Sequence, residues 1–126
     1  MSMVQRPTVF VVDDDPAVLK ALSRLLRSHS FRARTYESGL EFLAALQMDV
    51  PECLIVDLQM PDMNGVELQQ HLVRNRINIP TILITAHGDA LSHSDDGGFV
   101  ARLRKPLQEE ILFDAIERAV GCSRGR

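Results

Sequence analysis

The stretch LIVDLQMPDMNG, Leu54 to Gly65, places an acidic side chain directly after an apolar run. Leu54, Ile55 and Val56 are typical of a buried β-strand, and the residues after Asp57 are rich in turn-forming types. A carboxylate is costly to bury unless it is paired, binds a metal or faces solvent. We therefore expect Asp57 to lie at the end of a strand, with partners supplied by other parts of the chain.

Four further short runs have the composition of strands, and helical patterns separate most of them. The five predicted strands are 8–12, 31–36, 53–56, 81–85 and 99–104, and the predicted helices are 16–28, one from Ser38, 66–74 and one after Pro106. This alternation predicts right-handed βαβ units and a parallel sheet. The first, third and fourth runs are almost wholly apolar, whereas the second and fifth carry alternating arginines, as expected at sheet edges. The patterns favour a flavodoxin-like, doubly wound α/β fold with strand order 2-1-3-4-5.

Two helix starts can be assigned from local chemistry. Asp15 followed by Pro16 predicts an N-cap and a proline in the first turn, and Ser38 with Glu41 has capping-box spacing. The second helix is predicted to contain the apolar residues Leu40, Phe42, Leu43 and Leu46. The inner side of the last helix is predicted to include Ile111, Leu112, Ala115, Ile116, Ala119 and Val120.

Composition bounds the possible classes of protein. The chain has 126 residues, 45% of them hydrophobic and 25% charged, which predicts a single domain over 1–126 with a core from about 8 to 120. The net charge of -3 and the lack of a basic stripe argue against direct nucleic-acid binding. Cys53 and Cys122 form no C-x-x-C pair, and no apolar run approaches membrane-spanning length, so we expect a reduced, cytoplasmic setting without a membrane partner.

Polar residues follow four of the predicted strands. They are Asp13 and Asp14 after the first, Asp57 after the third, Thr85 at the end of the fourth and Lys105 after the fifth. The carboxyl ends of parallel strands meet at one edge of a sheet. Two carboxylates about 4 Å apart repel by roughly 4 kcal/mol at an effective dielectric near 20, and a hard cation such as Mg²⁺ relieves that repulsion. A metal and a lysine around one carboxylate suit phosphoryl transfer to an aspartate.

The segments VVDDDP, LIVDLQMPDMNG, ILITAHGD and RKP, in this order, resemble the receiver domain of two-component response regulators. The similarity is to the receivers of nitrogen-fixation-type regulators and covers about residues 8–120. It implies that Asp57 is the phosphoacceptor and that Lys105 contacts the phosphoryl group. It also implies that Asp13, Asp14, Asp57 and the backbone carbonyl of Gln59 bind Mg²⁺.

The resemblance further assigns a switch. Thr85 matches the hydroxyl that moves toward the phosphoryl group, and Gln59 and His87 match positions that modulate its hydrolysis. Lys105–Pro106 is expected to be a cis bond. Where many receivers have a switch aromatic, this chain has Arg102, which together with Arg104 we interpret as a solvated edge charge.

The segment ALSHSDDGG, residues 90–98, departs from the receiver pattern. It has two glycines, two aspartates and no apolar stripe, which disfavours a stable helix. The fourth helix of the family is therefore expected to be short, distorted or absent. Phosphorylation can still occur in such a chain, while its transmission to the output surface is altered.

The expected function is that of a regulatory phosphoacceptor rather than a conventional enzyme. A sensor histidine kinase would phosphorylate Asp57 in a Mg²⁺-dependent reaction, and the domain would catalyse only its own phosphorylation and slow dephosphorylation. The output would be a DNA-binding domain or a downstream protein outside this chain, and receiver faces could form a homodimer.

Three alternatives remain at this stage. A pseudo-receiver would act as an interaction module without phosphorylation. An aspartate-nucleophile phosphatase requires a second aspartate where this chain has Gln59, and an FMN-binding flavodoxin requires a phosphate loop where this chain has DDDP.

Overall fold

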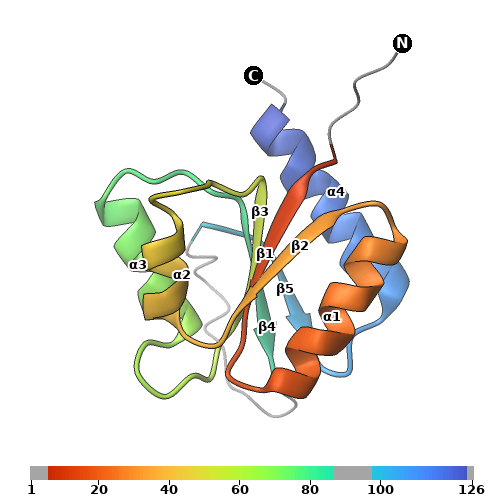
Figure 1. Cartoon of the computed structure of the whole chain (residues 1–126), viewed down its shortest axis with the longest axis horizontal. Coiled ribbons are helices and arrows are strands. Elements are labelled where there is room, and N and C mark those ends of the chain that lie inside the picture. Colours follow the sequence, from red (N-terminus) through yellow and green to blue (C-terminus); the bar gives the residue numbers. More distant parts are fainter. Residues whose placement is uncertain (1–5, 87–97, 125–126) are drawn as a thin grey trace.

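Five parallel strands form one sheet with helices on both of its faces (Figure 1). The computed structural model describes residues 6–86 and 98–124. Its elements are β1 (Thr8–Val12), α1 (Pro16–Ser28), β2 (Arg32–Tyr36), α2 (Gly39–Ala45), β3 (Cys53–Asp57), α3 (Gly65–Arg74), β4 (Thr81–Thr85), β5 (Phe99–Arg104) and α4 (Glu109–Arg124). No helix in these ranges is both long and apolar enough to cross a membrane.

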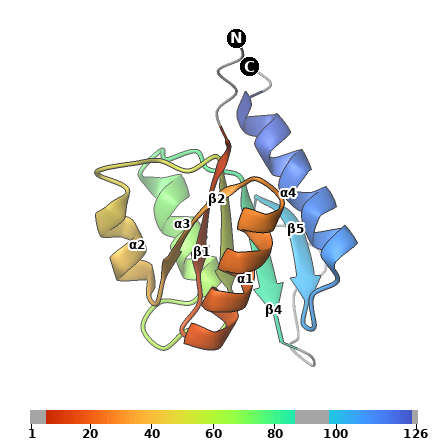
Figure 2. The same cartoon turned by 45° about the vertical axis from the view of Figure 1, so that its right-hand side comes forward.

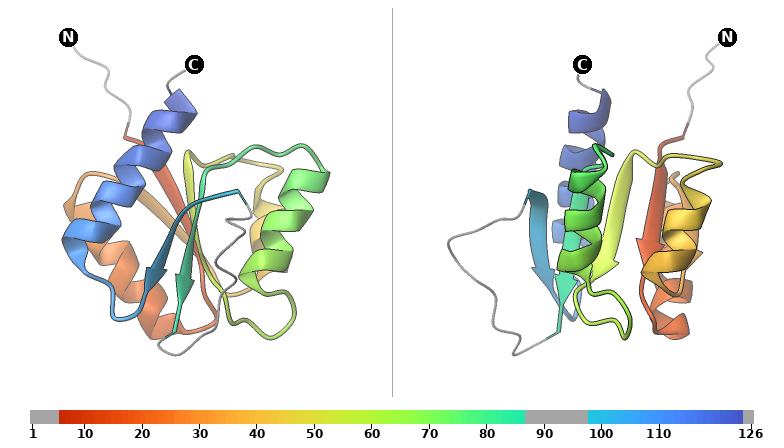
Figure 3. Two further views of the ribbon diagram at one scale, coloured as in Figure 1. Left: turned by 180° about the vertical axis from the view of Figure 1, so that it is seen from behind. Right: turned by 90° about the vertical axis from the view of Figure 1, so that its left-hand side faces the viewer.

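The strand order is β2-β1-β3-β4-β5, and every neighbouring pair is parallel. This confirms the predicted order and the flavodoxin-like class, with β2 and β5 at the edges. Because all strands run in one direction, their carboxyl ends lie at the same edge of the sheet (Figures 1 and 3).

The two faces of the sheet carry separate hydrophobic cores. Helices α1 and α4 cover one face, where Leu26 and Ile116 are fully buried, and α2 and α3 cover the other, where Phe42 and Leu68 are fully buried (Figure 2). Burial of each such side chain contributes about 1.5–3 kcal/mol. Strand residues alternate between the two cores, which is why the central strands are apolar at nearly every position.

The predicted helix starts are confirmed in their main features. Asp15 caps α1, and its side chain accepts a hydrogen bond from the Ala17 N–H at 2.9 Å. Ser38 caps α2 and accepts from the Glu41 N–H at 3.1 Å. The Glu41 carboxylate accepts from the Glu37 N–H rather than from Ser38, so the capping box there is only half formed.

One expectation about a buried face is wrong. Ile111 is 49% exposed, and Leu40, in α2, is 60% exposed. Each of the two lies next in sequence to a buried residue of its helix. A step of about 100° per residue therefore turns the side chain off the inner face.

The expectation that Arg102 on β5 is solvated needs correction. Arg102 is half-buried rather than solvated, with its Cζ atom 6.0 Å from the centre of the Phe99 ring, whereas Arg104 is exposed as expected. The stem of a long arginine side chain can cover apolar surface. His87 and residues 90–97, where the fourth family helix was expected to be disturbed, lie outside the described residues.

The connection from β3 to α3 is closed by an unpredicted reciprocal cap. Asn64 accepts from the Glu67 N–H at 2.8 Å, and the Glu67 carboxylate accepts from the Asn64 N–H at 2.9 Å. Gly65 then donates its N–H to the Leu58 carbonyl at 3.1 Å. A Cβ atom on Gly65 would lie 2.6 Å from Leu83 Cδ1 and 2.9 Å from the Asp57 carbonyl oxygen, so only glycine allows this approach.

We expect Gly65→Ala to lower the free energy of unfolding by about 2 kcal/mol, because the added methyl group meets backbone and a fully buried leucine. Gly39→Ala is the matched control, since Gly39 also begins a helix and its nearest neighbour is the flexible Met63 side chain at 3.3 Å. The control should change stability by less than about 1 kcal/mol. Urea denaturation followed by circular dichroism measures both, and equal stabilities would contradict the steric argument.

Candidate functional site

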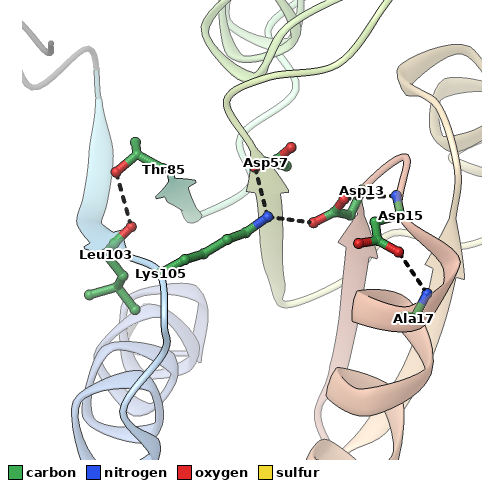
Figure 4. A network of polar contacts seen from close by, with 7 residues as sticks. All are labelled: Asp13, Asp15, Ala17, Asp57, Thr85, Leu103 and Lys105. Carbon is green, nitrogen blue, oxygen red and sulfur yellow. Dashed lines mark hydrogen bonds and ion pairs between the residues drawn. The ribbon is translucent and has the colours of Figure 1, made fainter. Parts of the chain in front are cut away.

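Four consecutive positions across the sheet bring polar residues to its carboxyl edge. Asp13 directly follows β1, Asp57 ends β3, Thr85 ends β4 and Lys105 directly follows β5 (Figure 4). The Lys105 N–H donates to the Thr85 carbonyl at 2.8 Å, which fixes the start of the Lys105 side chain beside β4.

Lys105 bridges the two buried carboxylates. Its Nζ atom lies 3.5 Å from Asp13 Oδ2 and 3.5 Å from Asp57 Oδ1. Asp13 and Asp57 are only 2% and 5% exposed, whereas the lysine side chain is 31% exposed. The lysine therefore reaches from the rim of the site to two acids that have little direct access to water.

Asp14 completes an acidic cluster with Asp13 and Asp57. One carboxylate oxygen from each residue lies within 4.8 Å of the other two, and Asp14 is the exposed member. Asp13 Oδ1 also accepts a hydrogen bond from the Asp15 N–H at 2.9 Å, which orients that carboxylate. The cluster offers three hard oxygen donors, the type that Mg²⁺ and Ca²⁺ prefer.

The electrostatics of the cluster are incompletely balanced. Burial, followed by the charge of Asp13, raises the pKa of Asp57 to about 6, and Lys105 offsets only part of this rise. Burial also raises the pKa of Asp13. Partial burial lowers the pKa of Lys105, but Asp13 and Asp57 outweigh it and leave that pKa above its ordinary value. One ammonium group thus faces three acids, an arrangement that a bound cation would relieve.

Among the four described strand-end positions, Thr85 is the one whose functional group points away from the acidic cluster. Its side chain is buried, and its hydroxyl donates to the Leu103 carbonyl of β5 at 3.4 Å (Figure 4). The structure therefore gathers Asp13, Asp14, Asp57 and Lys105 and holds the Thr85 hydroxyl against the neighbouring strand.

Two further predicted positions, Gln59 and Arg102, lie outside the acidic cluster. Gln59 follows Asp57 by two residues and has an exposed side chain, and Arg102 lies on β5. The Lys105–Pro106 bond is cis, as expected. Sequence reasoning missed the Asp15 N–H that orients Asp13, and it missed the close approach of Gly65. The N-G-x-E spacing of Asn64 to Glu67 was the available indication of the latter.

Comparison with known proteins agrees with this arrangement. The family model of the response regulator receiver domain matches residues 9–117. The chain is 40% identical over 114 residues to the transcriptional regulatory protein FixJ of Rhizobium meliloti (strain 1021), covering 89% of this chain and 56% of that protein. It is 37% identical over 120 residues to nodulation protein W of Bradyrhizobium diazoefficiens, covering 94% of this chain and 53% of that protein. The chain thus spans about half the length of these curated relatives.

Solved receiver structures are similar to this chain in both fold and sequence. The crystal structure of FixJ-N is 39% identical and covers 93% of this chain and 95% of that chain, with a TM-score of 0.84. The response regulator receiver protein from Burkholderia phymatum is 41% identical and covers 92% and 96%, with a TM-score of 0.81.

We expect Asp57→Asn to stabilise the metal-free protein at pH 7 by about 1–2 kcal/mol. The folded state raises the pKa of this carboxyl from 3.8 to about 6. The folded state therefore disfavours the ionised carboxylate, and this penalty appears as the pH rises from about 4 to about 6. Asparagine has the same shape and carries no charge. Urea denaturation in EDTA at several pH values measures the difference.

The stabilising effect should shrink near pH 4. There the Asp57 carboxyl of the folded wild-type protein is protonated and is uncharged, like the asparagine of the variant. Asp62→Asn, at an exposed position outside the cluster, is the control and should show little effect at either pH. A destabilised Asp57→Asn protein at neutral pH would contradict the charge imbalance described above.

Proposed function

The chain belongs to the response regulator receiver domain family, and from this premise we propose that Asp57 accepts a phosphoryl group from a sensor histidine kinase. The observation that carries the proposal is the position of the Asp57 carboxylate. It lies nearly buried at the end of β3, 3.5 Å from the Lys105 ammonium and beside two further acids.

In the proposed reaction a carboxylate oxygen of Asp57 attacks phosphorus, and the bond between phosphorus and the donor histidine nitrogen breaks. The product is an acyl phosphate on Asp57, which water later hydrolyses to the carboxylate and inorganic phosphate. Lys105 is suited to stabilise the negative charge on the phosphoryl oxygens, because its ammonium already lies beside Asp57. The domain acts as a regulated acceptor that promotes its own phosphorylation and slow dephosphorylation.

Asp13, Asp14 and Asp57, with the backbone carbonyl of Gln59, would hold Mg²⁺. The three carboxylate oxygens within 4.8 Å fit a hard divalent cation, and the raised pKa of Asp57 is consistent with a site short of positive charge. When bound, Mg²⁺ supplies charge that offsets the anionic oxygens of the phosphoryl group. Asp13 is held ready for this role by its hydrogen bond from the Asp15 N–H.

Thr85 is proposed as the switch. In the structure its hydroxyl bonds to Leu103 of β5, so a phosphoryl group on Asp57 would compete for that hydroxyl and draw it away from the edge strand. Arg102 stands on the same strand where many receivers have an aromatic, and we propose that it modifies how β5 responds. Gln59 and His87 are proposed to set the rate of dephosphorylation.

The partners follow from the family and from the length of the relatives. FixJ is named a transcriptional regulatory protein, and this chain spans 56% of it. We propose that the receiver controls a DNA-binding output domain or a downstream protein, and that it meets its kinase in the cytoplasm. Homodimerisation through a receiver face is part of the same proposal.

The direct test uses Mg²⁺ with acetyl phosphate, followed by intact-mass measurement. We expect one added phosphoryl group on the wild-type protein, because the buried carboxylate and Lys105 present an acceptor with charge stabilisation. The adduct should be cleaved by hydroxylamine, as an acyl phosphate is. Asp57→Asn should give no adduct, and Asp62→Asn, in the same loop region, should behave as the wild type.

Phosphoramidate serves as a second donor in case acetyl phosphate reacts poorly. The absence of an adduct with both donors and with a phosphorylated histidine kinase would overturn the proposal. It would favour the pseudo-receiver, a phosphorylation-independent interaction module.

The metal site has its own test in neighbouring aspartates. Asp14→Asn should weaken Mg²⁺ binding by about tenfold or more, because it removes one of three converging charges. Asp15→Asn should change it little, because Asp15 caps α1 and asparagine can do the same. Isothermal titration calorimetry measures both affinities. Equal losses in the two variants would contradict the assignment of Asp14 as a ligand.

A further inference from the structure

A cationic groove runs between α1 and the edge strand β2. Its larger part has a volume of about 670 Å³. The cations along it are Arg6, Lys20, Arg24, Arg27, Arg32 and Arg34, and Glu37 is the one acidic residue among the residues lining it. The whole chain has a net charge of -3, so this groove is opposite in sign to the rest of the molecule.

The groove contains the open edge of the sheet. Strand β2 pairs with β1 alone. The Arg32 N–H donates to the Pro7 carbonyl, and the Tyr36 carbonyl accepts from the Asp13 N–H, so the backbone groups of alternate residues of β2 face β1. The N–H and C=O of Thr35 therefore face outward, where the described chain has no strand.

Arginines flank this open edge from both faces of the sheet. Ala33 packs in the core beneath α1, so Arg32 and Arg34, which alternate with it, project from the opposite face. On the α1 side, Arg27 reaches the edge itself, since its Nη2 donates to the Ala33 carbonyl at 3.4 Å. A chain lying along β2 would meet cations on both of its faces.

We propose that the open edge of β2 binds an extended acidic peptide segment of a partner protein as an additional strand. The outward backbone groups of Thr35 supply main-chain pairing, and the flanking arginines supply selectivity for glutamate and aspartate. A peptide has the backbone N–H and C=O groups that this pairing needs, whereas a nucleic acid lacks them. A second copy of β2 would bring arginines against arginines, so the same residues disfavour self-pairing.

The test is fluorescence anisotropy with a labelled octapeptide of alternating glutamate and threonine at low salt. Arg32→Gln combined with Arg34→Gln should weaken binding by about tenfold, because two flanking charges are removed. Arg74→Gln combined with Arg76→Gln is the matched control, since these residues do not line the groove. Thr35→Pro should also weaken binding by removing the outward N–H while leaving the pairing with β1 intact, and Thr35→Ala should not.

Hydrogen exchange and two alternative ligands test the proposal independently of the arginine variants. In the wild type, the Thr35 amide should gain protection from hydrogen exchange when the peptide binds. Equal losses in the groove and control arginine variants would overturn the site. Equal binding of an acidic peptide interrupted by prolines, or of a single-stranded oligonucleotide of the same charge, would overturn the strand-pairing mode. Circular dichroism establishes that each variant is folded.

Discussion

The contact between Lys105 and two nearly buried carboxylates is the interaction on which the rest of the site depends. Asp13 and Asp57 come from different strands, and the lysine comes from the far end of the chain, yet its Nζ atom lies 3.5 Å from both. Without that charge, two acids would lie together in a poorly solvated space, and their repulsion would destabilise the folded state at these strand ends. The partial compensation leaves the cluster suited to a cation and to phosphoryl chemistry.

The fold makes this contact possible by ordering its strands. Placing β1 and β3 side by side puts Asp13 next to Asp57. Strand β4 lies between Asp57 on β3 and Lys105 after β5, and the long lysine side chain spans this gap. The Lys105 N–H and the Thr85 carbonyl join the ends of β4 and β5, so the cation and the hydroxyl are mechanically linked. Gly65 lets the end of the loop between β3 and α3 lie directly against the Asp57 backbone.

Much of this arrangement was accessible from the sequence because it depends on strand polarity and strand order. Apolar runs predicted the central strands, arginines predicted the edges, and the placement of Asp13, Asp14, Asp57 and Lys105 at strand ends followed. The orientation of the Thr85 hydroxyl toward Leu103 could not be predicted, because a rotamer depends on neighbours that sequence spacing does not specify. The partial burial of Arg102 depends likewise on local packing, which the sequence pattern does not specify.

The separation of the acidic strand ends from the arginine-lined flank gives the domain an electric dipole moment. Opposite charges gathered at different places on a small molecule create a field that extends about one Debye length, about 10 Å at 0.1 M salt. A charged partner approaching within that distance experiences a torque before any atoms touch. The receiver would therefore rotate into a preferred orientation during diffusion, and encounter rates at its two charged regions would respond in opposite ways to the sign of the partner.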